Sequence, residues 1–564
     1  MTSRHSHTHV TYSHRQLLGP AIEALKHPNP FVRKNAAGAL RTCVNAYRKD
    51  LSGETFTSFM TEVNKIIFDY VSSNVKNEKM GGILAIKALI DVTNSENEVQ
   101  IIRFANCLRV VFQQQSQNVD TDTLIAASEA LGYLARAGGT LTVDFVHFEV
   151  TRALEWLQSD RQSSRRLVAS LVLKELAENA PVLFYSHVST FFERVAAVLV
   201  DKDKVIRTSA TKALRACLSL ISDRDSRWRL KWYYKVYEIA QQGFSNGGTE
   251  ALHGALLVTK ELLENTGEFM VARFNEVCQI VYKYKDHRDR LIRDTVVTLS
   301  PSLAKYSPDA FVNDYLGEFM EHLVEKMARS SRRGIAFLAV GKMAVAVGRA
   351  FVPYLDRVLN QIHEALNQKS RRGLCLEALP CVSNLALAAS GSVLLVRLLP
   401  ASKAVKLDST GSSSSSSNAS SAPDPDKCDL LERMFDTGLS PALIEALETI
   451  GECIPALLSH VQNRLVEECS VILDHSVYQV PGSSANDGLF SASASKKYAK
   501  SRVNAQRDLY RKKMSKKPST PREALKKGRK MLGKAVGKRR MAGDKKGGGD
   551  AGDSLHPSPS LAPQ

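Results

Sequence analysis

One triplet, His287-Arg288-Asp289, has the residue types of a phosphoryl-transfer catalytic loop. In such loops the aspartate accepts the proton of the attacking hydroxyl, and an asparagine five residues later binds a magnesium ion. That later position is Asp294 here, and the sequence has no glycine-rich phosphate loop, strand lysine or Asp-Phe-Gly. Because the triplet leads directly into the apolar run Leu291-Ile292-Arg293, we interpret it as a helix–helix turn. We predict no catalytic residues, no cofactor and no ATP turnover.

Metal chemistry is also weakly supported. The histidines His5, His7, His9 and His14 form a short tract that can bind a metal ion adventitiously, but the surrounding segment has no scaffold to fix a site. The nine cysteines form no CxxC pair and no zinc spacing, and most lie in apolar helical runs. We predict no metal site and interpret the cysteines as reduced core residues of a cytosolic or nuclear protein.

Aromatic and basic residues are interleaved in one segment, and this gives the best candidate for a partner surface. Tryptophan, tyrosine and arginine are enriched at the energetic centres of protein interfaces. The competing interpretation is that these side chains pack helices together. The candidate residues are Trp228, Trp232, Tyr233 and Tyr234.

Three arginines recur at comparable places, Arg33, Arg207 and Arg293. Such arginines could bind an anion. We interpret them instead as structural, each placed beside an inter-repeat aspartate or a helix end, because similar repeats stack on one another.

The net charge of +18 is confined to one segment. Residues 496–546 carry 21 Lys and Arg against Asp508, Glu523 and Asp544, so the rest of the chain is neutral. Three roles remain open for this tail: a nuclear localisation signal, contact with a polyanion such as RNA or acidic lipid, and a solvated extension without a partner. The basic residues concerned are Lys526, Lys527, Arg529, Lys530, Lys538, Arg539 and Arg540.

The elements that must position any such site are helices. An apolar motif recurs about every 40 residues, which is typical of stacked helix pairs. We therefore predict an all-α solenoid of the HEAT or armadillo type, with about nine to eleven repeats. The copies centre on Ala39-Leu40, Ala88-Leu89, Ala130-Leu131, Val172-Leu173, Ala213-Leu214, Thr298-Leu299 and Ala378-Leu379.

Composition shifts divide the chain further. Serine-rich residues lack the apolar surface needed to offset the entropy of ordering. Because no run of 18 apolar residues occurs and the N-terminus has no signal region, we predict neither transmembrane insertion nor secretion. The predicted parts are a disordered N-terminus (1–15), a HEAT solenoid (16–400), a Ser-rich flexible insertion (401–427), a further HEAT repeat (428–480), a disordered segment becoming basic (481–519), a basic helix (520–541) and a disordered tail (542–564).

Seven distinctive segments occur in order along the repeats. These are Gly81–Ile86, Arg103–Arg109, Phe148–Leu157, Ala213–Leu218, His253–Leu257, Ala346–Gly348 with Pro353–Asp356, and Asp429–Leu431 with Gly438–Leu443. HEAT repeats are degenerate, so one such segment would mean little. In this order, over roughly residues 17–480, the segments resemble the N-terminal HEAT region of the target of rapamycin (TOR) kinases, which are PI3K-related serine/threonine kinases.

The resemblance implies a non-catalytic scaffold that docks a Raptor-like subunit and other TOR complex members, supports dimerisation in TORC1 and TORC2, and links nutrient signals to growth. It implies a cytoplasmic location, extended by partners to the nucleus or endomembranes. The family's later HEAT units, FAT region, rapamycin-binding domain and kinase are missing from these residues, which suggests a truncated or mispredicted gene product, a split gene or a protein that kept only the scaffold. A regulatory decoy that competes with the full-length kinase for a Raptor-like partner is a further alternative. The alternative function is a stand-alone HEAT adaptor that uses the basic tail.

Overall fold

The computed structural model describes residues 18–51, 53–92, 98–113, 120–159, 162–224, 228–246, 248–329, 331–367, 374–389, 398 and 430–474. Within these ranges the regular structure is entirely helical, with no strand, which confirms the all-α prediction. The predicted segments 1–15, 401–427, 481–519, 520–541 and 542–564 lie outside the described residues.

Contacts divide the chain into two units, Met1–Leu458 and Ser459–Gln564. The division falls inside the repeat predicted at 428–480, because helix α25 (Leu458–Asp474) begins at this boundary. The remaining helices belong to the first unit.

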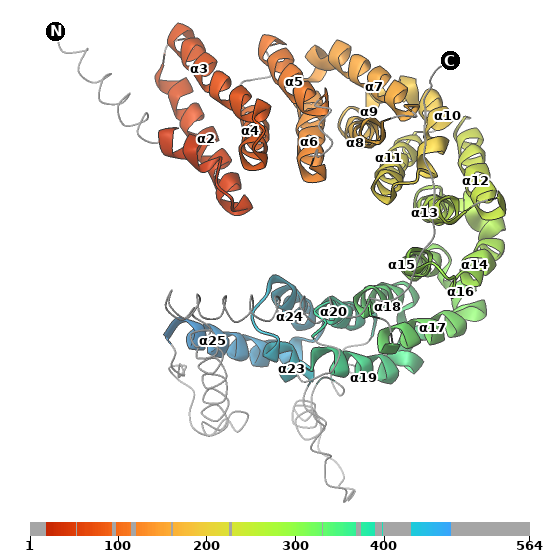
Figure 1. The fold of residues 1–564 in the computed structure, drawn as a ribbon. Helices are drawn as coiled ribbons and strands as arrows, with labels where there is room; N and C mark the ends of the chain where they lie inside the picture. The colour runs from red at the N-terminus through yellow and green to blue at the C-terminus, as the bar shows by residue number, and fades with distance from the viewer. Residues whose placement is uncertain are drawn as a thin grey trace, which may run out of the picture. The chain divides into compact units, whose positions relative to one another are not determined.

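The first unit is built from two rows of helices that alternate along the chain (Figure 1). Each first-row helix contacts the next one in the row, so this row forms a continuous stack. The first row consists of α2 (Pro30–Asp50), α4 (Lys76–Leu89), α6 (Thr121–Ala137), α8 (Ser163–Asn179), α11 (Lys204–Ser222), α13 (Thr249–Asn265), α15 (Arg290–Tyr306), α18 (Arg333–Val347), α20 (Ala378–Ala388) and α24 (Pro441–Cys453).

The second row covers the first and is joined to it by short helical segments. Its helices are α3 (Gly53–Ser72), α5 (Glu98–Gln113), α7 (Val143–Leu157), α10 (Val188–Leu199), α12 (Arg229–Asn246), α14 (Phe274–Lys283), α17 (Leu316–Arg329), α19 (Leu355–Leu366) and α23 (Leu430–Asp436). The joining segments are η1 (Gly139–Thr142), α9 (Pro181–Phe184), η2 (Tyr185–His187), η3 (Gly267–Arg273), α16 (Pro308–Asp314), η4 (Gly348–Tyr354) and η5 (Pro455–Leu457).

The recurring leucines mark the first row. All seven predicted copies place their leucine in a first-row helix at 0–1% exposure, from Leu40 in α2 to Leu379 in α20. The structure adds equivalent residues in the first-row helices that the sequence motif did not identify, namely Leu256 in α13, Val340 in α18 and Leu447 in α24. With these three, the described residues hold ten first-row helices, in the range predicted. Each buried leucine contributes about 2 kcal/mol through the apolar area removed from water.

The turn before α15 shows how a repeat joint is fixed. The ring Nδ1 of His287 accepts a hydrogen bond from the Asp289 amide at 3.1 Å, and Asp289 Oδ1 accepts one from the Leu291 amide at 2.7 Å. Arg293 Nη1 donates to the carbonyls of His287 and Arg288 at 2.6 and 2.8 Å. The kinase-like triplet is therefore the N-terminal cap of α15, as predicted for a helix–helix turn.

The same arrangement, which we call the loop clasp, occurs in residues 27–33 and 201–207. In both, the first residue's side chain accepts from the amide of the third, the third caps the amide of the fifth, and the arginine at the seventh position donates to the carbonyls of the first two. Arg33 and Arg207 are 6% and 3% exposed. All three recurring arginines thus bind loop carbonyls at a helix end, in agreement with the structural interpretation.

Two stretches of the described residues reach the length and hydropathy of a membrane span, Pro181–Leu199 and Arg333–Leu366. Neither is one regular helix. The first consists of α9, η2 and α10, and the second is broken between α18 and η4 at Gly348, whose φ is 58°. Helix α18 packs against α15, α17 and α20, so its apolar composition is accounted for by core packing.

Cysteines of the described residues are free, and most of them are buried. Burial raises the pKa of the Cys107 and Cys278 thiols to about 12, which keeps them protonated and unreactive. Cys453 is half-buried and Cys469 exposed, so the core interpretation does not extend to these two.

Removing the arginine of a loop clasp is expected to destabilise its joint. Arg207→Ala would leave the buried Asp201 carbonyl, the partly buried Lys202 carbonyl and His253 Nδ1 without their donor, at a cost of about 2–4 kcal/mol. Lys212→Ala, an exposed position on the same helix, serves as the matched control and is expected to change stability by less than about 0.5 kcal/mol. Urea unfolding followed by circular dichroism measures both; equal effects would contradict the role of the clasp.

Protonation of buried histidines is expected to destabilise the fold in acid. Burial lowers the pKa of His253, His322 and His363 to about 4, with help from Arg207, Lys326 and Arg433 respectively. Since the unfolded pKa is 6.5, stability is fully present above pH 6.5 and is lost as the pH falls towards 4. By pH 5, each histidine is expected to lower the free energy of unfolding by about 2 kcal/mol.

Thermal unfolding between pH 7 and pH 5 tests this dependence, with His253→Gln as the diagnostic variant. Glutamine keeps an acceptor for Arg207 without taking up a proton, so the variant is expected to show a shallower pH dependence. A melting temperature that stays constant from pH 7 to pH 5 would argue against the histidines as its cause.

Candidate protein-binding surface

Helix α12 separates the predicted aromatic residues onto different faces. Tyr233, Val236 and Ala240 follow helical spacing and are 0–3% exposed, so they form the buried side. Trp228, which precedes the helix, and Tyr234 are each 50% exposed. Tyr233 is a candidate surface residue by sequence, but the structure buries it in the core. Burial raises the pKa of its phenol.

Trp232 is half-buried at the joint with the preceding repeat. Its ring stacks on Phe192 of α10, with centroids 6.0 Å apart, and meets Tyr185 of η2 edge-on at 6.4 Å. These contacts make Trp232 mainly a packing residue, as the competing interpretation of the segment held.

Segment η3 contributes two residues that the sequence analysis did not identify. The Phe269 ring lies 5.1 Å from Tyr234 in an edge-on contact and 5.5 Å from Tyr233. The Arg273 guanidinium lies over Phe269 at 4.4 Å and over Tyr234 at 5.1 Å, which is cation–π geometry. The sequence signal for Phe269 and Arg273 is only their spacing of four residues. In the structure, the segment that holds them begins at Gly267, whose φ is 53°.

We call this region the aromatic surface. Its exposed apolar members are Trp228, Leu230 at 55% exposure and Tyr234, flanked by Phe269 and Arg273. The Lys231 ammonium lies 5.4 Å from the centre of the Trp228 ring. Large rings held by neighbours lose little side-chain entropy on binding, so the surface suits an apolar protein partner rather than a small molecule.

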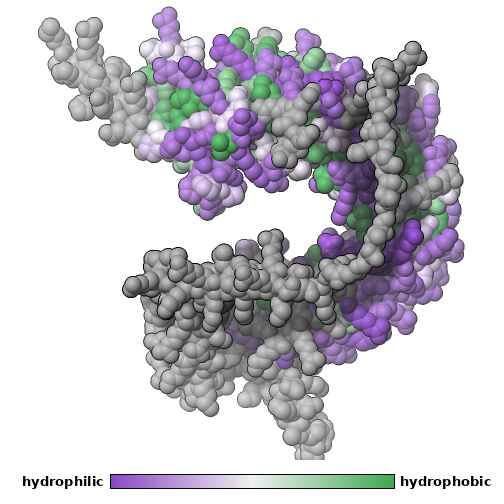
Figure 2. Space-filling view, in the orientation of Figure 1, coloured by the Kyte–Doolittle hydropathy of each residue, from purple (hydrophilic) through white to green (hydrophobic). Residues whose placement is uncertain are grey.

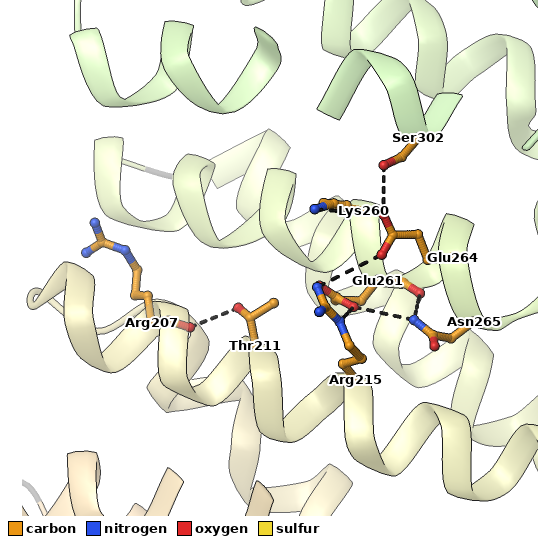
Figure 3. Close-up of polar contacts among 8 residues, drawn as sticks. All are labelled: Arg207, Thr211, Arg215, Lys260, Glu261, Glu264, Asn265 and Ser302. Atoms are coloured by element: carbon orange, nitrogen blue, oxygen red, sulfur yellow. Dashed lines mark hydrogen bonds and ion pairs between the residues drawn. The ribbon is translucent and has the colours of Figure 1, made fainter. Parts of the chain in front are cut away.

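The first row carries polar contacts of a different kind, which run from helix to helix (Figure 3). Arg215 of α11 donates from Nε and Nη2 to the Glu261 carboxylate of α13, each at 2.7 Å. Asn265 Nδ2 donates to the Glu261 carbonyl at 2.9 Å, and Ser302 of α15 donates to Glu264 at 2.8 Å. Because Glu261 is only 2% exposed and already bound, this network is structural.

The same local arrangement occurs two repeats earlier, in α8. Asn179 Nδ2 donates to the Glu175 carbonyl at 2.9 Å, just as Asn265 does to Glu261. The segments Lys174–Asn179 and Lys260–Asn265 differ only at Ala177 and Leu263. The repeated segment is therefore a sequence signal for this contact within the helix, which the leucine motif alone did not reveal.

A hollow of 970 Å³ lies beside α2, α4 and α6. Its apolar lining includes Ala37, Gly38 and Leu84, and Arg41 and Asp91 form an ion pair at 3.0 Å at its edge. Figure 2 shows hydrophobic residues interspersed with hydrophilic ones over the helices of the first unit. Two lysines of the lining are also paired, Lys76 with Asp122 at 3.5 Å and Lys87 with Glu129 at 3.1 Å.

The structure bears on metal binding only within the described residues, and it does not describe the basic tail. Among the described residues no group of three His, Cys, Asp or Glu side chains is placed to hold a metal ion. The N-terminal histidines lie outside the described residues, as do Lys526, Lys527, Arg529, Lys530, Lys538, Arg539 and Arg540.

Several curated proteins similar in sequence to this chain are TOR kinases. It is 38% identical over 458 residues to the serine/threonine-protein kinase TOR of Oryza sativa subsp. japonica, covering 81% of this chain and 17% of that protein. It is 37% identical over 447 residues to TOR of Arabidopsis thaliana, with 79% and 17% covered. Identity to tor1 of Schizosaccharomyces pombe is 34% over 458 residues, with 81% and 18% covered. No family model matches the chain.

Among solved structures, crystal structures of Kap121p are similar at 15% identity. One has a TM-score of 0.41 and covers 87% of this chain and 45% of that one. Another, of Kap121p bound to Ste12p, also has a TM-score of 0.41 and covers 80% and 43%.

The stacked helix pairs define an α-solenoid of the HEAT type. Given the identity to the curated kinases over four-fifths of its length, the chain belongs to the TOR family and corresponds to the N-terminal HEAT region of those kinases. It spans about 17% of the length of the relatives it matches, away from their kinase domain.

Alanine substitutions should separate exposed from packed members of the aromatic segment. Trp228→Ala and Tyr234→Ala are expected to change the free energy of unfolding by less than about 1 kcal/mol, because both rings are largely solvated. Trp232→Ala removes the contacts with Phe192 and Tyr185 and is expected to cost about 2 kcal/mol or more. Urea unfolding of the three variants measures these changes. Similar losses of stability in Trp228→Ala and Trp232→Ala would contradict the assignment of Trp228 to the surface and Trp232 to the packed joint.

Proposed function

We propose that this chain is a protein-interaction scaffold of a TOR-type kinase that acts in TOR complex assembly and in nutrient and growth signalling. The observation that carries the proposal is the identity of 38% over 458 residues to a curated TOR kinase. The proposed partners are a Raptor-like subunit and other members of the TORC1 and TORC2 assemblies. Its proposed location is the cytoplasm, with the nucleus and endomembranes reached through partners.

The aromatic surface supports this role physically. A neutral solenoid has little long-range attraction for a partner, so its affinity must come from short-range burial of apolar area. Trp228 and Tyr234 offer such area, and Arg273 is positioned over the Tyr234 ring at 5.1 Å. A few residues of these types carry most of the binding energy in typical protein interfaces.

A second candidate function is a stand-alone HEAT adaptor that binds polyanions or enters the nucleus through the 496–546 tail. The observation that favours it is the concentration of the entire charge of +18 in that segment. Counterion release would make such binding strongly dependent on salt.

Affinity measurements with a purified Raptor-like subunit test the first function. The full chain is expected to bind, and the double variant Trp228→Ala with Tyr234→Ala is expected to bind at least about 30-fold more weakly, which corresponds to roughly 2 kcal/mol. The matched control is Phe148→Ala, because Phe148 is 52% exposed on α7 and lies 4.5 Å under the Arg109 guanidinium.

The possible outcomes are distinct. Wild-type binding that Phe148→Ala weakens as much as the double variant would contradict the role of the aromatic surface. No binding at all would reject the Raptor-like partner, and salt-sensitive RNA binding that disappears when residues 496–546 are deleted would favour the adaptor.

A further inference from the structure

A basic cavity lies at one joint of the first unit, where the turn between α17 and α18 meets the start of α15. Its volume is 290 Å³. The cavity is lined by two carboxylates, Asp294 and Glu325, against a larger number of cations. These cations are Arg290, Arg293, Lys326, Arg329 and Arg332.

The carboxylates of the cavity do not balance its positive charge. Asp294 Oδ2 lies 2.8 Å from Arg332 Nη1 and 4.0 Å from Arg290 Nε, so one carboxylate serves two guanidinium groups. Glu325 bonds Arg329, with 3.2 Å between Oε1 and Nη1. Lys326 is paired with Asp286 at 3.3 Å. Four arginines then remain against two carboxylates, so the cluster has capacity for a further anion with several acceptor oxygens.

Ser331 lines the same cavity, and its hydroxyl contacts one of the arginines. Arg290 Nη2 donates to Ser331 Oγ at 2.9 Å, across 41 residues of sequence. Ser331 is exposed in a turn, directly before Arg332, which is the N-cap residue of α18 and makes no side-chain bond to the first-turn amides. A negative charge at this position would also be favoured by the N-terminus of α18.

We propose that Ser331 is a phosphorylation site and that the phosphate is bound by Arg290 and Arg332. In the reaction, Ser331 Oγ attacks the γ-phosphorus of magnesium-bound ATP in a protein kinase that prefers basic sequences. The Oγ–P bond forms, the bond to the β-phosphate oxygen breaks, ADP leaves, and the hydroxyl proton passes to the kinase's base. The sequence suits such a kinase, because Arg329, Arg332 and Arg333 flank the serine.

The phosphate would act on the joint between two repeats. Arg290 belongs to α15, whereas Ser331 and Arg332 belong to the turn that starts α18. A dianion with three acceptor oxygens makes one to three charge-assisted hydrogen bonds where the hydroxyl makes one. Binding of both guanidinium groups would therefore tie α15 to α18 more firmly than the single contact of the unmodified serine.

The binding half of the proposal is tested by installing phosphoserine at position 331 of the full chain through genetic-code expansion. Hydrogen exchange of the first-turn amides of α18 is expected to slow by about 10-fold relative to the unmodified chain. This slowing is expected to vanish in an Arg290→Ala background. It is expected to persist in the control Arg329→Ala, because the Arg329 side chain is 78% exposed. No slowing, or slowing that survives Arg290→Ala, overturns the assigned site.

The modification half is tested with a basophilic kinase, magnesium and ATP, followed by mass spectrometry of the folded chain. A synthetic peptide of residues 325–337 reports the kinase's preference independently of the fold. Phosphate on Ser331 in both, absent from Ser331→Ala, is the expected result. A peptide labelled at Ser331 beside an unlabelled folded chain, or labelling of Ser330 alone, overturns the site, and an unlabelled peptide overturns the kinase class. None of these outcomes depends on the proposed binding of a Raptor-like subunit.

Discussion

A first-row helix of this solenoid has more apolar surface than any single partner can cover. In α8, buried residues occur at nearly every position from Leu167 to Ala177, and the helix contacts α6 and α11 in its own row as well as α7. Burial on several sides means that no repeat has a complete core alone, so each depends on both neighbours for stability. Apolar contact is non-directional, however, and by itself does not fix the angle at which one helix pair follows the next.

Directional contacts supply that angle. The loop clasp fixes the path of the chain into a first-row helix, because its arginine donates to two carbonyls of the preceding turn. Within the first row, Arg215 of α11 makes two hydrogen bonds to the Glu261 carboxylate of α13, and this two-point contact orients one helix against the next. The histidine and aspartate of the His287-Arg288-Asp289 triplet are explained by this role. Asp289 is the N-cap of α15, and His287 Nδ1 accepts a hydrogen bond from the Asp289 amide.

The approximate period of the leucine motif was sufficient to predict the fold, because each leucine is buried in a helix that packs on the equivalent helix of the next repeat, in most cases about 40 to 50 residues further on. The aromatic surface could be predicted only in part. Helical spacing alone distinguishes Tyr233 from Tyr234, but Phe269 and Arg273 reach them from the next repeat through η3, whose course depends on the positive φ of Gly267. Likewise, the arginines that flank Ser331 are visible in the sequence, but Arg290, 41 residues earlier, is placed against the serine only by the fold.

Charge distribution separates two modes of binding within one chain. Outside residues 496–546 the basic and acidic side chains balance, and many of them are consumed in contacts between repeats, such as Lys87 with Glu129 at 3.1 Å. A partner on the solenoid would therefore be held by apolar anchors, with modest dependence on ionic strength. A partner of the tail would be held by counterion release and lost as salt rises. Ionic strength thus distinguishes binding by the solenoid from binding by the tail without any change to the sequence.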